Sequence, residues 1–153
     1  MSGTLAVTIL GCGSSGGVPR ADGDWGVCDP AEPKNRRLRC SLLVRRRAED
    51  GEGPETTVLV DTSPDGREQA VAANIRRLDG VLCSHDHADQ THGIDDLRSV
   101  VLHQRRRIPV YLNQSTAKDI IARFSYCFTA PPGSDYPAIL ERCDVEAGES
   151  RTI

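Results

Sequence analysis

The side chains best suited to chemistry lie in one segment, residues 84–93, which reads Ser-His-Asp-His-Ala-Asp-Gln-Thr-His-Gly. It holds three of the four histidines in the chain. If the segment begins as a strand, His85, His87 and Asp89 project from one face, because strand side chains alternate with a period of two. Two imidazoles and a carboxylate at that spacing suit Zn²⁺, with Mn²⁺ or Fe²⁺ as alternatives. A solvated loop rich in histidine is the other interpretation, but this clustering favours a metal site.

Two short apolar runs would position this segment. Residues 80–84 (Gly-Val-Leu-Cys-Ser) favour a buried strand directly before it. Residues 56–60 favour a second strand, which ends at Asp61. A carboxylate directly after a buried strand destabilises the fold unless hydrogen bonds or a partner compensate for its burial. From the residues alone, Asp61 could be a helix N-cap or a turn residue.

The remaining hydrophobic pattern alternates strands with helices and predicts an α/β fold in one domain, residues 1–153. Ser115 is the expected N-cap of the last predicted helix. Further strands are expected at 5–10, 41–44 and 108–112, and helices at 67–78, 94–102 and 116–124.

A glycine-rich turn, residues 11–19, follows the first expected strand and reads Gly-Cys-Gly-Ser-Ser-Gly-Gly-Val-Pro. Such a loop could hold a phosphate or a dinucleotide. No Gly-Lys-Ser/Thr follows it and no convincing helix begins there, so a β-turn is the simpler interpretation.

The histidine segment resembles the His-x-His-x-Asp-His-x-x-Gly signature of the metallo-β-lactamase-fold hydrolases, matched here by His85, His87, Asp89 and Gly93. The glycine-rich turn is similar to the opening of the ribonuclease Z-like and cyclic-phosphate phosphodiesterase branches of that superfamily. The resemblance implies that His85 and His87 bind a first metal, and that Asp89 binds a second or orients a metal-bound hydroxide. It also implies that Asp61 braces the histidines without touching metal, so Asp89 and Asp61 are the expected catalytic carboxylates.

Gln90 departs from the signature, which has a histidine at that position. A glutamine carbonyl is a weaker zinc ligand than an imidazole, so the expected cofactor is one or two ions. His92 could replace the missing ligand if a helix begins near Asp89, because residues three apart share a helix face. Otherwise His92 faces the substrate or supports the ligands.

The resemblance implies a four-layer αβ/βα sandwich, of which this chain would be the N-terminal half: a mixed β-sheet with helices on one face. No histidine follows His103, so the family's later histidine ligands have no counterpart in this sequence. A half-sandwich exposes sheet surface, and a homodimer is one way to cover it.

Composition narrows the class of partner. The net charge of −3 argues against nucleic-acid binding by bulk charge, although arginine clusters at 36–39, 45–47 and 105–107 could contact phosphate. No apolar run reaches the length of a membrane span and no secretory leader is evident, so we expect a cytoplasmic protein with reduced thiols.

Together these observations predict a metal-dependent hydrolase, and the glycine-rich turn favours a phosphodiesterase acting on a small or nucleotide-like phosphodiester. One alternative is a metal-binding or interaction module without catalytic activity, which Gln90 and the absent second half favour. Another is an RNA-processing nuclease of the same superfamily, which would need a basic binding surface.

Overall fold

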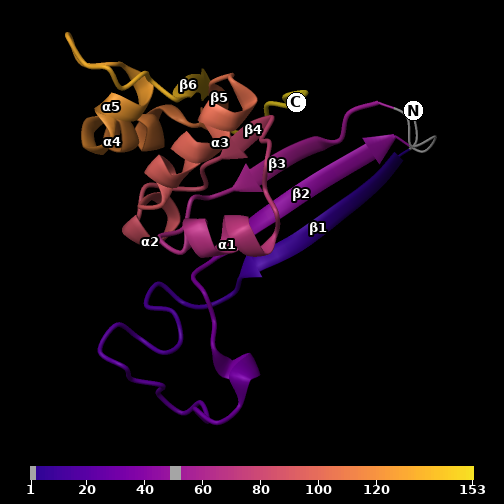
Figure 1. The fold of residues 1–153 in the computed structure, drawn as a ribbon, viewed down its shortest axis with the longest axis vertical. Helices are drawn as coiled ribbons and strands as arrows, with labels where there is room; N and C mark the ends of the chain where they lie inside the picture. The colour runs from indigo at the N-terminus through magenta and orange to yellow at the C-terminus, as the bar shows by residue number, and fades with distance from the viewer. Residues whose placement is uncertain (1–2, 49–52) are drawn as a thin grey trace.

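In the computed structural model, which describes residues 3–48 and 53–153, six strands form one mixed sheet in chain order (Figure 1). The first three strands pair antiparallel, and each of the last three adds in parallel to the strand before it. The strands are β1 (Gly3–Gly11), β2 (Ser41–Ala48), β3 (Thr56–Val60), β4 (Gly80–Leu82), β5 (Ile108–Leu112) and β6 (Leu140–Asp144). The sequence predicted all of these except β6.

Parallel neighbours need crossover connections, and the helices supply them. One helix, α1 (Gly66–Ala72), connects β3 to β4. The connection from β4 to β5 contains α2 (Ala88–Thr91), the 3₁₀ turn η2 (Ile94–Asp96) and α3 (Leu97–Gln104). The connection from β5 to β6 contains α4 (Gln114–Arg123) and α5 (Ser125–Phe128). A further 3₁₀ turn, η1 (Pro33–Asn35), precedes β2. None of the described helices is long and apolar enough to cross a membrane.

Several helix boundaries differ from the sequence predictions. The helix predicted at 94–102 divides into η2 and α3, which ends at Gln104, and the helix predicted at 116–124 is Gln114–Arg123. The first crossover helix ends at Ala72 instead of residue 78, because Asn74 adopts a left-handed backbone conformation with φ of 50°. The predicted cap Ser115 was wrong: Asn113 caps α4, and its side chain accepts a hydrogen bond from Thr116 N at 2.8 Å. An extended residue before the helix can reach that N–H, whereas Ser115 already lies inside the first turn.

The helices pack on one face of the sheet, and the core lies between the two layers. Leu43, Leu59, Val81 and Val110 are cross-strand neighbours on four adjacent strands, so they share one face, and all four are buried in the core. This arrangement confirms the predicted mixed sheet with helices on one face.

The other face of β1 is uncovered among the described residues. Leu5, Val7 and Ile9 alternate along the strand and are 62%, 58% and 66% exposed. Their neighbours continue the apolar surface onto β2, where Val44 pairs with Val7 and Leu42 with Ile9. The apolar surface on this face is therefore open to solvent at β1, whereas Val58, which pairs with Val44 on the next strand, is only 8% exposed.

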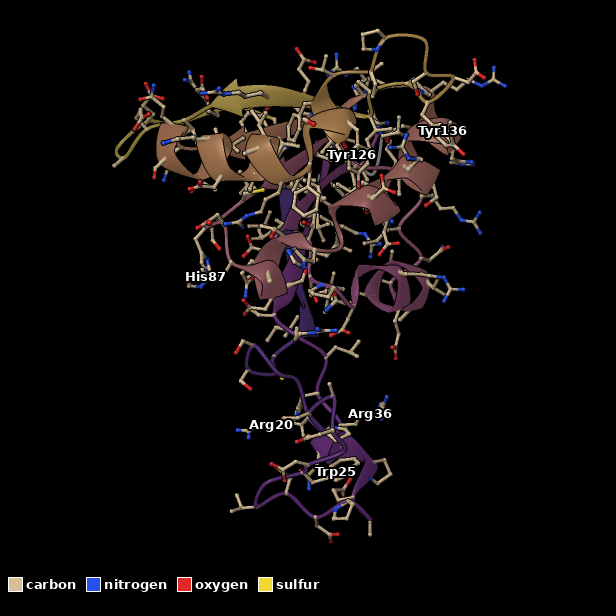
Figure 2. The ribbon with its side chains drawn as sticks, turned by 90° about the vertical axis from the view of Figure 1, so that its left-hand side faces the viewer. Arg20, Trp25, Arg36, His87, Tyr126 and Tyr136 are labelled. Atoms are coloured by element: carbon tan, nitrogen blue, oxygen red, sulfur yellow. The ribbon has the colours of Figure 1, made fainter. Side chains whose placement is uncertain are left out.

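Residues 12–40, between β1 and β2, extend from the body as an arm (Figures 1 and 2). The glycine-rich turn leads into this arm. A side chain at Gly11 would overlap the Arg39 carbonyl oxygen, so glycine permits the close approach of the two chains at the base of the arm. Figure 2 places Trp25 in the arm and well away from His87, so this part of the arm does not cover the histidine segment.

Candidate metal centre

The histidine segment leaves the sheet at the carboxyl end of β4, the edge where open α/β sheets usually bind ligands. His87 is still extended (φ −63°, ψ 152°), and α2 begins at the next residue. One potential ligand atom from each of His85, His87 and Asp89 lies within 4.8 Å of the others. His87 is exposed and Asp89 is half-buried, so the group is open to solvent. The structure thus brings together three of the four residues predicted as metal ligands.

The donors of this cluster, defined as His85, His87 and Asp89, fit a borderline divalent cation. Imidazole nitrogen and carboxylate oxygen are ligands of Zn²⁺, and two histidines with one carboxylate also suit Fe²⁺ or Mn²⁺. The two imidazole rings stand edge to face, with centroids 4.7 Å apart and planes at 73°.

Ser84 connects Asp61 to the first histidine. Its backbone N–H and its hydroxyl donate to the two Asp61 carboxylate oxygens at 2.8 and 2.7 Å, and its hydroxyl oxygen lies 2.9 Å from His85 Nδ1. The single hydroxyl proton goes to Asp61, since an ionised carboxylate only accepts. Ser84 must therefore accept from Nδ1–H, which leaves the lone pair of His85 on Nε2. Asp61 thus fixes the tautomer of His85 through Ser84.

The backbone holds Asp61 in place for this contact. Asp61 is 6% exposed and has a φ of 61°, a conformation that aspartate tolerates better than most residues. Its N–H donates to Leu82 O at 2.8 Å, and its carbonyl accepts from Ser41 Oγ at 3.0 Å. The N-cap of α1 is Asp65, so Asp61 is not a helix cap. Its carboxylate instead faces the segment that carries the histidines.

The segment after β3 is fastened to α2 by backbone hydrogen bonds. Thr62 N donates to Gln90 O at 2.8 Å, and Gly93 N donates to Thr62 O at 2.9 Å. A Cβ at Gly93 would overlap the Ser63 carbonyl oxygen. This close approach explains the glycine that ends the histidine segment, and it fixes α2 against the end of β3.

Gln90 and His92 lie next to the cluster but do not extend it. Gln90 is 7% exposed, and its Nε2 donates to Asp89 Oδ2 at 2.9 Å. His92 is the C-cap residue of α2, and its ring contacts Phe124 edge-on with 5.6 Å between centroids. A helix does begin near Asp89, as expected, but it leaves His92 outside the group of donors that could share an ion.

Arg123 of α4 anchors the residue between the two clustered histidines. Its guanidinium donates to the Asp86 carboxylate at 2.7 Å and also to the Asp86 carbonyl oxygen. The hydrogen bond from Arg123 lowers the pKa of Asp86. Sequence reasoning assigned no role to Ser84 or Arg123. The serine adjoins the motif and could have been noticed, but Arg123 lies 37 positions from Asp86 and carries no local signal.

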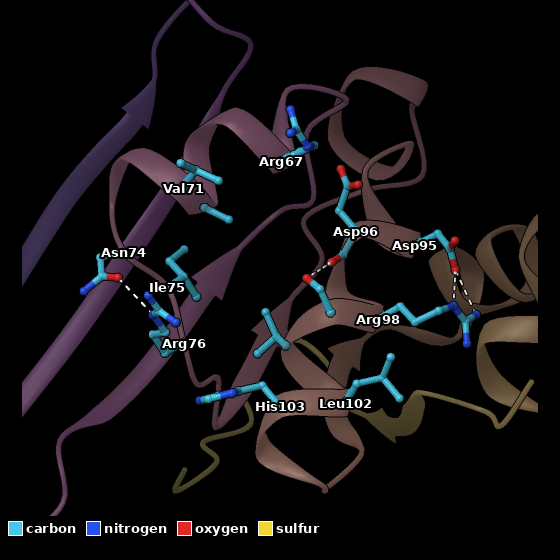
Figure 3. Close-up of a pocket in the computed structure, with 13 residues that line it drawn as sticks. Arg67, Val71, Asn74, Ile75, Arg76, Asp95, Asp96, Arg98, Leu102 and His103 are labelled. Carbon is cyan, nitrogen blue, oxygen red and sulfur yellow. Dashed lines mark hydrogen bonds and ion pairs between the residues drawn. The ribbon is translucent and has the colours of Figure 1, made fainter.

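A groove of about 760 Å³ runs between α1 and α3 and is separate from the cluster (Figure 3). Arg67 and Arg76 line its α1 side, and Arg98 and His103 line its α3 side. None of the three clustered donors lines this groove. The candidate metal centre is therefore distinct from this groove and lies open at the strand ends.

Residues 56–153 match the family model of the beta-lactamase superfamily domain. A diphosphatase from the PhnP family, known from a crystal structure, is 34% identical to this chain with a TM-score of 0.74. That match covers 94% of this chain and 51% of the diphosphatase.

Two solved structures of lower identity share the fold. The metallo-β-lactamase-fold protein YhfI from Bacillus subtilis is 18% identical (TM-score 0.59), and the match covers 97% of this chain and 48% of YhfI. The long form of RNase Z from yeast is 17% identical (TM-score 0.57), and the match covers 92% of this chain and 17% of that protein.

A curated relative, an octanoyltransferase of Porphyromonas gingivalis, is 37% identical over 138 residues. That match covers 90% of this chain and 26% of the octanoyltransferase. The chain thus spans about a quarter of this relative and about half of the PhnP-family diphosphatase.

Proposed function

The chain belongs to the metallo-β-lactamase-fold superfamily, and on that premise we propose that it supplies the metal-binding half of a hydrolase acting on phosphodiester or diphosphate bonds. The 34% identity to a diphosphatase supports this class of bond. The match to an octanoyltransferase does not support acyl transfer, because it covers only 26% of that protein.

The convergence of His85, His87 and Asp89, with ligand atoms within 4.8 Å, is the observation that carries this proposal. A divalent cation held there would supply Lewis acidity, which activates water and stabilises charge on phosphoryl oxygens. The chain's own part is to present His85 Nε2 in the tautomer set by Ser84 and Asp61, and to hold Asp89 in the first turn of α2. The exposure of His87 leaves access for a small or nucleotide-like phosphodiester.

The test compares His87→Ala with His103→Ala, two exposed histidines of which only the first belongs to the cluster. Wild type and His103→Ala should retain Zn²⁺ or Mn²⁺ after dialysis and hydrolyse bis(p-nitrophenyl) phosphate or pyrophosphate. His87→Ala should lose both properties while its circular dichroism stays unchanged. Equal metal retention and equal turnover in all three proteins would overturn the proposal.

A metal-binding domain without turnover is the second candidate. Gln90 favours it, because its amide faces Asp89 at the position where the family signature has an imidazole. Metal retention that depends on His87, without hydrolysis of either substrate, would support this candidate. Cleavage of a labelled RNA in preference to the small substrates would instead favour a nuclease.

A further inference from the structure

We infer that the cluster is a single-ion centre in which Gln90 is a positioning residue that orients Asp89 and is not itself a ligand. This inference rests on the proposed function, because it concerns the same cluster. It adds the number of ions, the way in which Asp89 binds, and a role for a residue that departs from the family signature.

The hydrogen bond between Gln90 and Asp89 fixes which end of the amide faces the cluster. An ionised carboxylate can only accept, so the group 2.9 Å from Asp89 Oδ2 must be the NH₂ of Gln90. An amide nitrogen that donates in this way has no lone pair to offer a cation. Gln90 therefore acts on the ion only through Asp89.

The backbone of Gln90 is held at both of its polar groups, and the residue is 7% exposed. Its backbone N–H donates to His87 O at 3.0 Å, and its backbone carbonyl oxygen accepts from Thr62 N at 2.8 Å and lies 3.3 Å from the Thr62 hydroxyl. The buried side chain then reaches Asp89 through its Nε2. Turning the amide oxygen toward the cluster would break the bond to Asp89 and place two oxygen acceptors against each other.

The bond to Gln90 uses one lone pair of Asp89 Oδ2, so Oδ1 is the less encumbered oxygen for a cation. One carboxylate oxygen and two imidazole nitrogens make three protein donors, the number that an open zinc site commonly uses. Within residues 3–48 and 53–153, His85, His87 and Asp89 form the only group of three or more such side chains close enough to share an ion. A second ion would thus have no donor set of its own in this part of the chain.

Two residues that do not bind the ion themselves therefore each orient one ligand of the cluster. Ser84 orients His85 by accepting from Nδ1, and Gln90 orients Asp89 by donating to Oδ2. Outer contacts of this kind fix the direction of a ligand's lone pair, and their loss typically lowers metal affinity by about 10- to 100-fold.

The experiment titrates Co²⁺ and Zn²⁺ into the 153-residue chain by calorimetry and records the visible spectrum of the Co²⁺ form. Wild type should bind one ion per chain. Gln90→Met removes the donor at similar volume, and it should bind the same number of ions about 10- to 100-fold more weakly, with an altered Co²⁺ spectrum. Gln69→Met is the matched control. Gln69 lies on α1, outside the cluster, is 3% exposed, and its side-chain NH₂ donates to Arg39 O at 2.8 Å, so the same change removes a buried amide donor elsewhere. Its affinity and spectrum should equal those of wild type.

A measurement on the wild type needs no variant to fold. The side-chain NH₂ of Gln90 should give an NMR signal that exchanges slowly with solvent and persists after one equivalent of Zn²⁺ is added. Two ions per wild-type chain, an unchanged affinity and spectrum in Gln90→Met, or loss of the protected NH₂ signal on Zn²⁺ binding would each overturn the inference. The proposed function fails separately, when His87→Ala binds and turns over like wild type.

Discussion

The buried Asp61 carboxylate accepts both hydrogen bonds that Ser84 can donate, from the backbone N–H at 2.8 Å and from the hydroxyl at 2.7 Å. The pairing joins the end of β3 to the start of the histidine segment, 23 residues later. It satisfies a buried carboxylate, and it leaves the serine oxygen free to accept from His85. One contact therefore serves both the fold and the orientation of an imidazole.

Ser84→Ala tests this contact. The change removes the acceptor for His85 Nδ1–H and one donor to Asp61, so we expect metal affinity to fall about 10- to 100-fold. We also expect the free energy of unfolding to fall by about 1–3 kcal/mol, because an Asp61 oxygen loses its hydroxyl partner. Chelator competition and urea unfolding measure the two effects. Ser99→Ala is the control, since Ser99 is exposed and donates only to Asp96 O on the helical side. A variant that loses stability but keeps wild-type affinity would contradict the orienting role.

Arg39 and Asp65 join the base of the arm to the start of α1. Arg39 donates from Nε at 2.9 Å and from its terminal nitrogen at 2.6 Å, and its backbone N–H adds a bond of 2.8 Å. These hydrogen bonds hold the pKa of Asp65 below its ordinary value of 3.8. A carboxylate with a depressed folded pKa stabilises the protein fully above its unfolded pKa, and this stabilisation is lost as pH falls through the folded value.

Asp65→Asn should therefore lower the free energy of unfolding by about 1–3 kcal/mol near neutral pH. The difference from wild type should shrink once the pH falls below 3.8. Asp24→Asn is the matched control, because its ion pair with Arg20 spans 3.4 Å between side chains that are 67% and 48% exposed. We expect that change to cost less than about 1 kcal/mol. Urea unfolding at neutral and acidic pH measures both, and a constant difference for Asp65→Asn down to the lowest pH would contradict the prediction.

The sequence predicted five of the six strands, all but β6, and the cluster, because both depend on short-range pattern. Alternating and apolar runs specify a strand within a few residues, and the His85, His87 and Asp89 spacing places three donors together whatever the rest of the chain does. The contacts of Ser84 and Arg123 could not be predicted in the same way. They join residues 23 and 37 positions apart, so they exist only once the crossovers have brought β3, β4 and α4 together.

His92 and Ser115 show where a local rule was too weak. Both assignments rested on residue type and spacing, which ignore competing partners. The ring of His92 packs on Phe124 instead of joining the three donors. Asn113 takes the cap position before Ser115 can. In each case tertiary packing or an earlier polar residue decided the outcome.

Gly93→Ala should destabilise the protein by about 1–3 kcal/mol, because the new Cβ would overlap the Ser63 carbonyl oxygen and force the backbone to shift. The same shift would move α2, so metal affinity should fall as well. Gly16→Ala is the control, since its Cβ would meet only the Arg20 side chain, 3.3 Å from Cγ, which can move aside. Urea unfolding and chelator competition on both variants make the comparison. Equal stability for the two variants would mean that the close approach of Gly93 to the Ser63 carbonyl does not constrain the fold.

Cys127 should resist alkylation in the folded protein. Burial, together with the nearby Asp95, raises the pKa of this thiol to about 11, and the thiolate is the reactive form. Near pH 8 only about one Cys127 in a thousand would be ionised, and raising the pH should speed its reaction. The exposed Cys12 and Cys40 should react with iodoacetamide first. Mass spectrometry of peptides after timed quenching gives the order, and labelling of Cys127 as fast as Cys12 would contradict it.

The exposed face of β1 should make the isolated chain associate. Leu5, Val7 and Ile9 form an apolar row that continues onto β2, and association would remove this surface from water. We expect Val7→Lys to shift the sedimentation coefficient of concentrated protein toward that of a monomer. Val71→Lys is the matched control, because Val71 is 74% exposed but lies on α1, on the helical side of the sheet. It should leave association unchanged. If wild type and Val7→Lys both sediment as monomers at every concentration, the uncovered face does not drive homodimer formation.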